Sequence, residues 1–108
     1  MIVLVNKYIL AKGFRGISLW PFVILKNEYL KDDIFLLNHE KIHLKQQTEL
    51  FVIFFYIWYG IEYLVRIFQY KNRFLAYRNI SFEREAYQNE MNIEYTKTRK
   101  FWDFIKYL

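Results

Sequence analysis

The order of apolar and polar positions predicts two short strands followed by a series of helices. Residues 2–10 are largely apolar and partly β-branched, so a first strand is expected near Ile2–Val5. Gly13 and Gly16 mark a turn, and residues 17–25 then have the composition of a second strand.

Pro21 lies inside this second strand. Because proline has no backbone N–H, the strand is expected to lie at a sheet edge or to contain a bulge, and an ordinary hairpin is the alternative. An edge strand here would accept an extended peptide as an additional strand. The residues expected to hold that peptide are Phe22, Val23, Ile24 and Leu25.

A helix is predicted to begin near Ile34. Asp32 or Asp33 can cap its N-terminus, and both carboxylates suit the positive end of the helix dipole. Farther along, Ser81 is expected to cap another helix that runs to about Tyr95. A final amphipathic helix is expected over residues 101–108.

The segment Leu50–Phe68 is almost wholly apolar and is predicted to form one continuous helix. Glu62 and Arg66 are its charged residues, and their spacing of four allows them to pair. A helix that is apolar all round must be buried all round. Its length approaches that of a bilayer span, so three settings stay open: a membrane, a plain core and an oligomer interface.

These elements predict one α+β domain that covers residues 1–108. A small N-terminal β-hairpin would pack on three to four helices, one of them very hydrophobic.

Composition narrows the classes of partner. Hydrophobic residues make up 55% of the chain, which excludes a disordered protein. The absence of cysteine excludes disulfides and thiolate metal sites, so any metal must use histidine and carboxylate. The net charge is +5, but the chain contains no Lys/Arg block and no nucleic-acid motif. Anionic lipid is therefore favoured over nucleic acid as the partner of these charges. The start lacks the basic region of a signal peptide, so a cytoplasmic or cytoplasmic-membrane-associated protein is expected.

The candidate chemistry lies in His39-Glu40-Lys41-Ile42-His43, which has the form H-E-x-x-H and contains both histidines of the chain. On a helix, positions four apart share a face, so the two imidazoles can bind one metal ion. Glu40 can then take a proton from the attacking water. The alternative is a solvated helix face that happens to carry these residues.

A catalytic zinc site needs a third protein ligand, which here must be a carboxylate. The helix that opens at Ser81 carries Glu83 and Glu85, which point to different faces, so only one can reach the metal. The small Ala86 lies three residues after Glu83 and would let two helices approach on that face, which favours Glu83 and leaves Glu85 pointing outward. Alternatively, both glutamates only stabilise a helix N-terminus.

The H-E-x-x-H sequence and the downstream Glu83-Arg84-Glu85-Ala86-Tyr87 together resemble the gluzincin branch of the zincin metallopeptidases. The resemblance covers about residues 17–95 and extends to short bacterial proteins with the same motifs. Some members of that branch are embedded in membranes.

The resemblance implies that His39, His43 and Glu83 bind Zn²⁺ and that Glu40 is the general base. Tyr87 stands where many members have an aspartate that orients a ligand histidine, and its hydroxyl is expected to take that role. Candidates for stabilising the transition state are Tyr77, Arg78 and Arg84.

The predicted function is a zinc-dependent peptidase that acts on a peptide or protein and is associated with a membrane. A second hypothesis is a zinc-binding or metal-free interaction module without turnover, which the lack of a further histidine favours. A third is a small membrane adaptor whose histidines are incidental.

Overall fold

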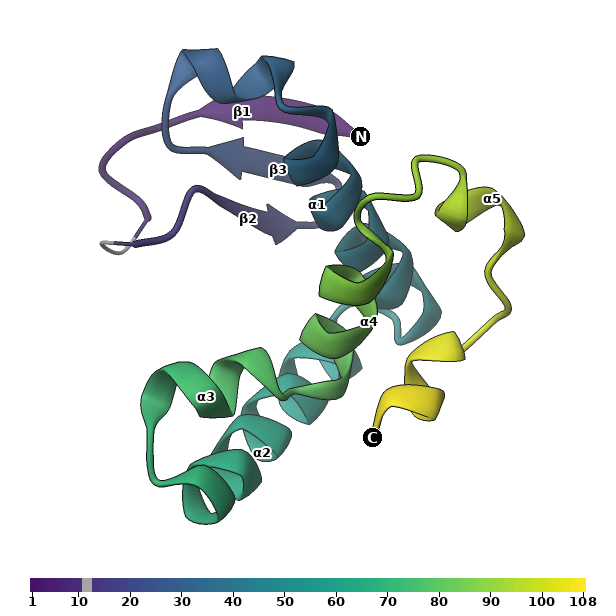
Figure 1. The fold of residues 1–108 in the computed structure, drawn as a ribbon. Coiled ribbons are helices and arrows are strands. Elements are labelled where there is room, and N and C mark those ends of the chain that lie inside the picture. Colours follow the sequence, from purple (N-terminus) through teal and green to yellow (C-terminus); the bar gives the residue numbers. More distant parts are fainter. Residues whose placement is uncertain (11–12) are drawn as a thin grey trace.

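A computed structural model describes residues 1–10 and 13–108. Its N-terminal part is a three-stranded sheet in the order β1-β3-β2 (Figure 1). The strands are β1 (Ile2–Val5), β2 (Gly16–Leu19) and β3 (Phe22–Leu25). β3 pairs in parallel with β1 and antiparallel with β2. The α+β prediction is therefore confirmed, but the sheet is mixed and three-stranded where a two-stranded hairpin was expected.

β3 is the central strand, so the prediction that Phe22–Leu25 forms an open edge is wrong. Pro21 lies between β2 and β3, outside both ladders, where its missing N–H costs no strand pairing. β1 then covers the second side of β3. The pattern of residues 17–25 could not reveal this, because β1 is separated from β3 by many residues.

A series of helices follows the sheet (Figure 1). Asp33, one of the two aspartates predicted to cap the first α-helix, does cap it by accepting a hydrogen bond from the Leu36 N–H. The predicted helix to Tyr95 is shorter, and a 3₁₀ turn replaces the final amphipathic helix. The elements are η1 (Glu28–Asp32), α1 (Ile34–Glu49), α2 (Ile53–Tyr70), α3 (Arg73–Arg78), α4 (Ser81–Asn89), α5 (Tyr95–Thr98) and η2 (Asp103–Tyr107).

The chain turns sharply between α1 and α2. Phe51 and Val52 have φ angles of 53° and 64°, values that side-chain-bearing residues rarely adopt. The predicted continuous helix from Leu50 is therefore wrong at its start. Within the described residues no single helix is long and apolar enough to cross a bilayer, whereas α1 and α2 together pass that test as a pair bent by 111°.

The main helical core lies where α2, α4 and η2 meet. Phe82 of α4 is fully buried between Phe55 of α2 and Phe104 of η2, with ring centroids 4.5 and 4.6 Å away. Glu62 of α2 accepts hydrogen bonds from the backbone N–H and the hydroxyl of Ser81, and so anchors the first turn of α4. Ser81 is thus the first residue of the helix and not its cap.

Candidate metal centre

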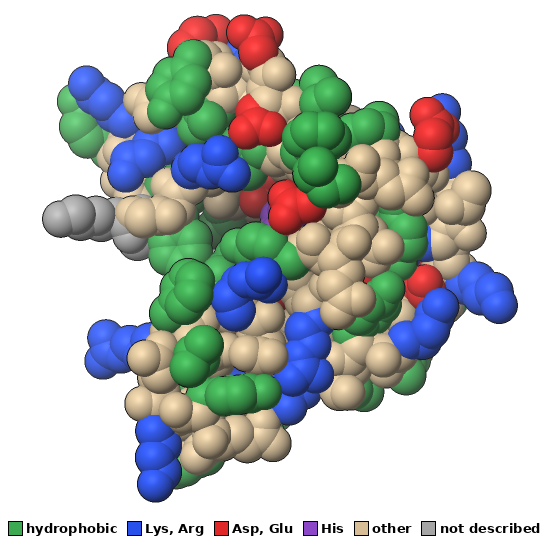
Figure 2. Space-filling model, in the orientation of Figure 1, with side chains coloured by type: hydrophobic (Ala, Val, Ile, Leu, Met, Phe, Trp, Pro, Cys, Tyr) green, Lys and Arg blue, Asp and Glu red, His purple; other side chains and the backbone are tan. Residues whose placement is uncertain are grey.

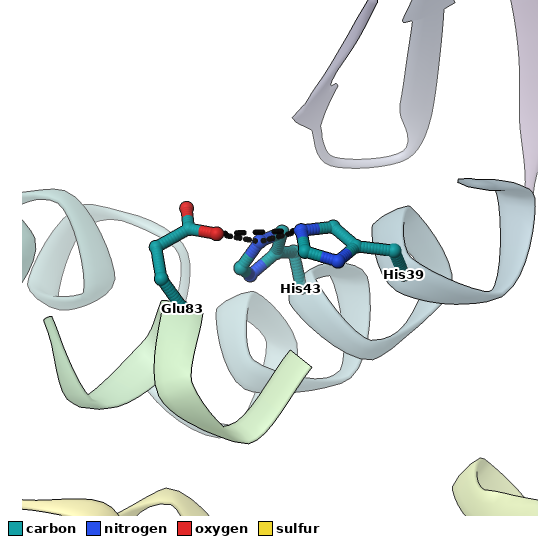
Figure 3. A group of neighbouring side chains, drawn as sticks. All are labelled: His39, His43 and Glu83. Carbon is teal, nitrogen blue, oxygen red and sulfur yellow. Dashed lines mark hydrogen bonds and ion pairs between the residues drawn. The ribbon is translucent and has the colours of Figure 1, made fainter. Parts of the chain in front are cut away.

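Two helices bring three predicted ligands together. His39 and His43 lie one turn apart on α1, and Glu83 faces them from the first turn of α4 (Figure 3). Glu83 Oε1 lies 3.3 Å from His39 Nε2 and 3.0 Å from His43 Nε2, and the two imidazole nitrogens are 3.2 Å apart. All three side chains are about 95% buried. The structure therefore does place these three residues in one group.

The spacing of these atoms fits a tetrahedral metal ion. Two ligands each about 2.1 Å from a tetrahedral centre lie roughly 3.4 Å apart, close to the separations observed. Two neutral imidazoles and one carboxylate are a ligand set that Zn²⁺ uses in catalytic sites. His39, His43 and Glu83 are also the residues whose ligand atoms converge in the described part of the chain.

The charges of the three groups are strongly coupled. Burial lowers the pKa of His39, but the carboxylates of Glu83, Glu90 and Glu40 together outweigh burial and raise that pKa from 6.5 to about 9. Burial would raise the pKa of Glu83, but the two histidines lower it well below its usual range. Glu83 is therefore ionised, and the imidazoles attract a proton that a metal ion must displace.

Gln46 fixes the orientation of the His43 ring. Its side-chain nitrogen donates to the Phe82 carbonyl at 3.1 Å and to Glu85 Oε1 at 2.9 Å, which leaves its oxygen as an acceptor. That oxygen lies 2.8 Å from His43 Nδ1. Nδ1 must therefore carry a proton, so in the neutral ring the lone pair is on Nε2 and points to the site.

Glu83 is held on its other oxygen. The Tyr59 hydroxyl of α2 donates to Glu83 Oε2 at 2.7 Å. Burial, reinforced by the Glu83 charge, raises the pKa of Tyr59 far above its usual value, so the hydroxyl keeps its proton and remains a donor. Oε1 is thereby left to face the imidazoles.

Glu40 lies beneath β2. The Ser18 hydroxyl is 2.6 Å from Glu40 Oε2 and 2.9 Å from the Glu40 carbonyl. At Gly16 a Cβ atom would lie 3.6 Å from Glu40 Oε1 and 3.2 Å from Leu25 Cδ2. A glycine here lets the backbone of β2 pass close to Oε1, while Ser18 holds Oε2.

The residues that follow α4 support His39. The Asn38 side chain donates to the carbonyls of Asn89, Glu90 and Asn92, which fastens the end of α4 to α1. Glu90 Oε2 consequently lies 3.7 Å from His39 Nδ1, so its charge favours a proton on that nitrogen. Glu90 is thus the carboxylate beside His39.

The role predicted for Tyr87 is wrong. The Tyr87 hydroxyl pairs with the Tyr77 hydroxyl at 3.0 Å, while its ring packs edge-on against His39 with centroids 4.4 Å apart. Tyr87 thus contacts His39 through its ring and not through its hydroxyl. Arg78 stacks on the Tyr87 ring, with the guanidinium carbon 3.6 Å from its centroid.

Tyr77 is linked to the site through Tyr87, whose hydroxyl lies 3.0 Å from the Tyr77 hydroxyl. Burial raises the pKa of Tyr77 far above its usual value, and the charges of Glu83 and Glu40 add to that rise, so the hydroxyl stays protonated. Arg84 points away, because it donates to the Tyr107 carbonyl and to Asn79.

The sequence suggested that Glu85 points outward, and this expectation is wrong. Glu85 is fully buried, and Arg99 donates to it at 2.7 and 3.1 Å. The Tyr95 hydroxyl adds a hydrogen bond of 2.7 Å. The two glutamates do face opposite sides of α4, but both sides are covered.

Sequence reasoning missed several supporting residues. Gln46 was detectable, because it lies three residues after His43 and so shares its helix face. Ser18, Tyr59 and Glu90 gave no local signal, since each reaches the site only through tertiary packing.

The site lies inside a hollow of the surface. Figure 2 shows this hollow between the sheet and the end of the molecule formed by α2 and α3, with acidic and histidine atoms visible inside it. In comparisons with known proteins, no family model, curated protein or solved structure matches this chain.

Proposed function

We propose that this protein is a zinc-dependent peptidase. The observation that carries the proposal is the convergence of His39 Nε2, His43 Nε2 and Glu83 Oε1 within hydrogen-bonding distance of one another, one residue from Glu40. Bound there, Zn²⁺ supplies a Lewis acid that makes water nucleophilic at neutral pH and polarises a carbonyl group.

The protein's own side chains would bind the metal ion and transfer the protons. His39, His43 and Glu83 are the ligands, and Gln46 and Tyr59 hold two of them in position. Glu40 is the general base, and Oε1 is the atom that takes the proton, because Oε2 accepts the Ser18 hydroxyl. Glu40 then passes that proton to the leaving amine.

The backbone of Gly16 can bind an extended peptide substrate. The Lys26 N–H donates to the Arg15 carbonyl, so by strand alternation the N–H and C=O of Gly16 face away from β3. An extended peptide that pairs with them would lie beside Glu40 Oε1. Among the described residues this edge of β2 is unpaired, because β2 lies at the outside of the sheet.

Two substitutions test the proposal together. Glu40→Gln keeps the shape of the side chain but cannot take up a proton at neutral pH, so zinc content should stay near wild type. Hydrolysis of a peptide library should fall by at least about 10²–10⁴-fold. Glu83→Gln should instead lower the zinc content itself, because it removes a charged ligand.

Metal content by mass spectrometry and cleavage by peptide mapping are the two readouts. A Glu40→Gln variant that cleaves as fast as wild type would contradict the mechanism even with zinc bound. A wild-type protein that holds about one zinc ion and cleaves nothing would favour the interaction module. A wild-type protein without zinc affinity would favour the adaptor.

A further inference from the structure

α2 has one buried face and one exposed apolar face. Glu62 and Phe55 are its buried residues, and they turn toward α4 and the metal centre. The opposite face is formed by large apolar side chains whose exposed fractions run from 47% for Val65 to 81% for Phe68. We call it the α2 apolar face, and its residues are Ile53, Phe54, Ile57, Ile61, Leu64, Val65 and Phe68.

The size of this face is unusual for a protein surrounded only by water. The seven side chains recur at helical spacing along all five turns of α2, so they share one side of the helix. Contiguous apolar patches on monomers rarely exceed roughly 300–600 Å². Seven apolar side chains in one row, each at least 47% exposed, reach beyond that range.

The charges around the face are positive. Residues 50–82 contain one acidic residue, Glu62, which is buried against Ser81 and pairs with Arg66 at 3.4 Å. Lys71 and Arg73 are exposed at the end of α2 and the start of α3. Figure 2 shows the same at the α2–α3 end of the molecule, where Lys and Arg side chains surround hydrophobic ones and no acidic side chain is visible.

Apolar and cationic groups meet in one groove at this end. The groove is lined by the end of α2 and the beginning of α3, and its residues are Ile67, Phe68, Lys71, Asn72 and Arg73. An apolar wall beside two exposed cations matches a molecule with an acidic head and a hydrocarbon tail. Anionic phospholipids have that chemistry.

We propose that the α2 apolar face docks on the surface of a bilayer that contains anionic phospholipid. The apolar side chains enter the boundary between headgroups and acyl chains, and Lys71 and Arg73 bind the lipid phosphates. α2 lies in the plane of the interface, because its other face remains packed on α4. None of the three candidate metal ligands lies on the α2 apolar face, so lipid docking does not depend on the proposed peptidase activity.

A second copy of the chain fits the same face less well. A symmetric dimer would place α2 of one copy against α2 of the other, so each contact would occur twice. Lys71 and Arg73 of each copy would then face residues 50–61 of the other, which contain no carboxylate. Charge complementarity therefore favours anionic lipid as the occupant.

Cosedimentation of the full chain with vesicles tests the proposal. Wild type should sediment with vesicles of phosphatidylcholine and phosphatidylglycerol, and much less with phosphatidylcholine alone. The variant Ile57→Ser, Ile61→Ser, Phe68→Ser should bind at least about tenfold more weakly, since it removes the apolar contact. The three side chains that it replaces are exposed in water, so the far-UV circular dichroism spectrum should stay unchanged.

A second pair of variants separates charge from apolar contact. Lys71→Gln with Arg73→Gln should weaken binding to anionic vesicles by about fivefold per charge and remove the preference for them. Tyr29→Ser with Met91→Ser is the control, because these residues are 70% and 68% exposed outside α2. The control should bind as wild type does.

Three results would overturn the proposal. One is wild type that fails to sediment with anionic vesicles, and another is equal binding to both lipid compositions. The third is a wild-type dimer in buffer that ignores vesicles and that the Ile57→Ser, Ile61→Ser, Phe68→Ser variant converts to monomer. That result would assign the face to a second copy of the chain.

Discussion

Glu83 and Glu85 are two buried carboxylates on the same helix, two residues apart, and their surroundings differ in kind. Glu85 faces Arg99, whose guanidinium is always charged, and Tyr95 and Gln46 satisfy its remaining acceptor sites. Glu83 faces His39 and His43, whose charge depends on pH. Both are at least 96% buried.

This difference assigns Glu85 to the structural scaffold and Glu83 to the candidate metal centre. A buried carboxylate beside a permanent cation is neutralised at every pH, so the Glu85 region is complete without any further partner. Glu83 has only imidazoles and the Tyr59 hydroxyl among its described contacts, so its charge is balanced by a proton or a metal ion. Gln46 contacts both regions, since it bonds to His43 and to Glu85.

The largest predicted effect is on the scaffold side. Arg99→Met should lower the free energy of unfolding by about 3–5 kcal/mol, because it leaves Glu85 and Glu49 buried without a cation. Urea denaturation measures this. The control Lys97→Met removes a side chain that is 69% exposed and should change stability little. Equal stability of the two variants would break the contrast between Glu83 and Glu85.

On the site side, Glu83→Gln should weaken zinc binding by more than about 100-fold, which exceeds the usual effect of losing a residue behind a ligand. Competition with a chelating dye measures the affinity. Glu94→Gln, an exposed acid-to-amide change, is the control. If Glu83→Gln binds zinc as tightly as this control, Glu83 is scaffold in the same sense as Glu85.

Gln46 is predicted to have an intermediate effect. Gln46→Met keeps the volume but removes the acceptor for His43 Nδ1, so zinc affinity should fall by about 10–100-fold. Gln47→Met is a matched control, because Gln47 is equally buried but bonds to Ser18 of β2 and to Trp20, which follows β2. The control should lose stability while the folded protein keeps its zinc affinity. A reversal of these two outcomes would contradict the role of Gln46.

Measured over a single pH unit, the smallest effect is a pH dependence. The pKa of His39 is raised to about 9, so below that pH zinc must displace a proton. Zinc affinity should rise by about tenfold per pH unit for each proton displaced, up to about pH 9. In metal-free protein, protonated His39 stabilises the fold fully below pH 6.5, and this contribution is lost as the pH rises through about 9. Zinc affinity that is constant with pH would contradict this coupling.

Local spacing explains which parts of the site could be predicted. His39 and His43 are four residues apart on a helix, and that distance alone places their rings together. Glu83 was predicted from the small Ala86 on its helix face, and Ala86 is indeed fully buried. Arg99 could not be assigned to Glu85, because the two lie on different segments and their pairing depends on how the chain folds back after α4.

The errors share one physical cause, which is long-range packing. The position of β3 at the centre of the sheet depends on β1, and no pattern within residues 17–25 contains that information. The end of α1 was equally hidden, since the turn uses Phe51 and Val52, two residues that usually avoid positive φ.

The bend of 111° between α1 and α2 relates the two proposals to each other. α1 carries His39, Glu40 and His43, and α2 carries the apolar face that is proposed to dock on lipid. If α2 lies in the interface, the corner at residues 50–52 sets the height of the candidate metal centre above the bilayer. A peptidase held in this way would select a bond by its distance from the membrane as well as by the residues around it.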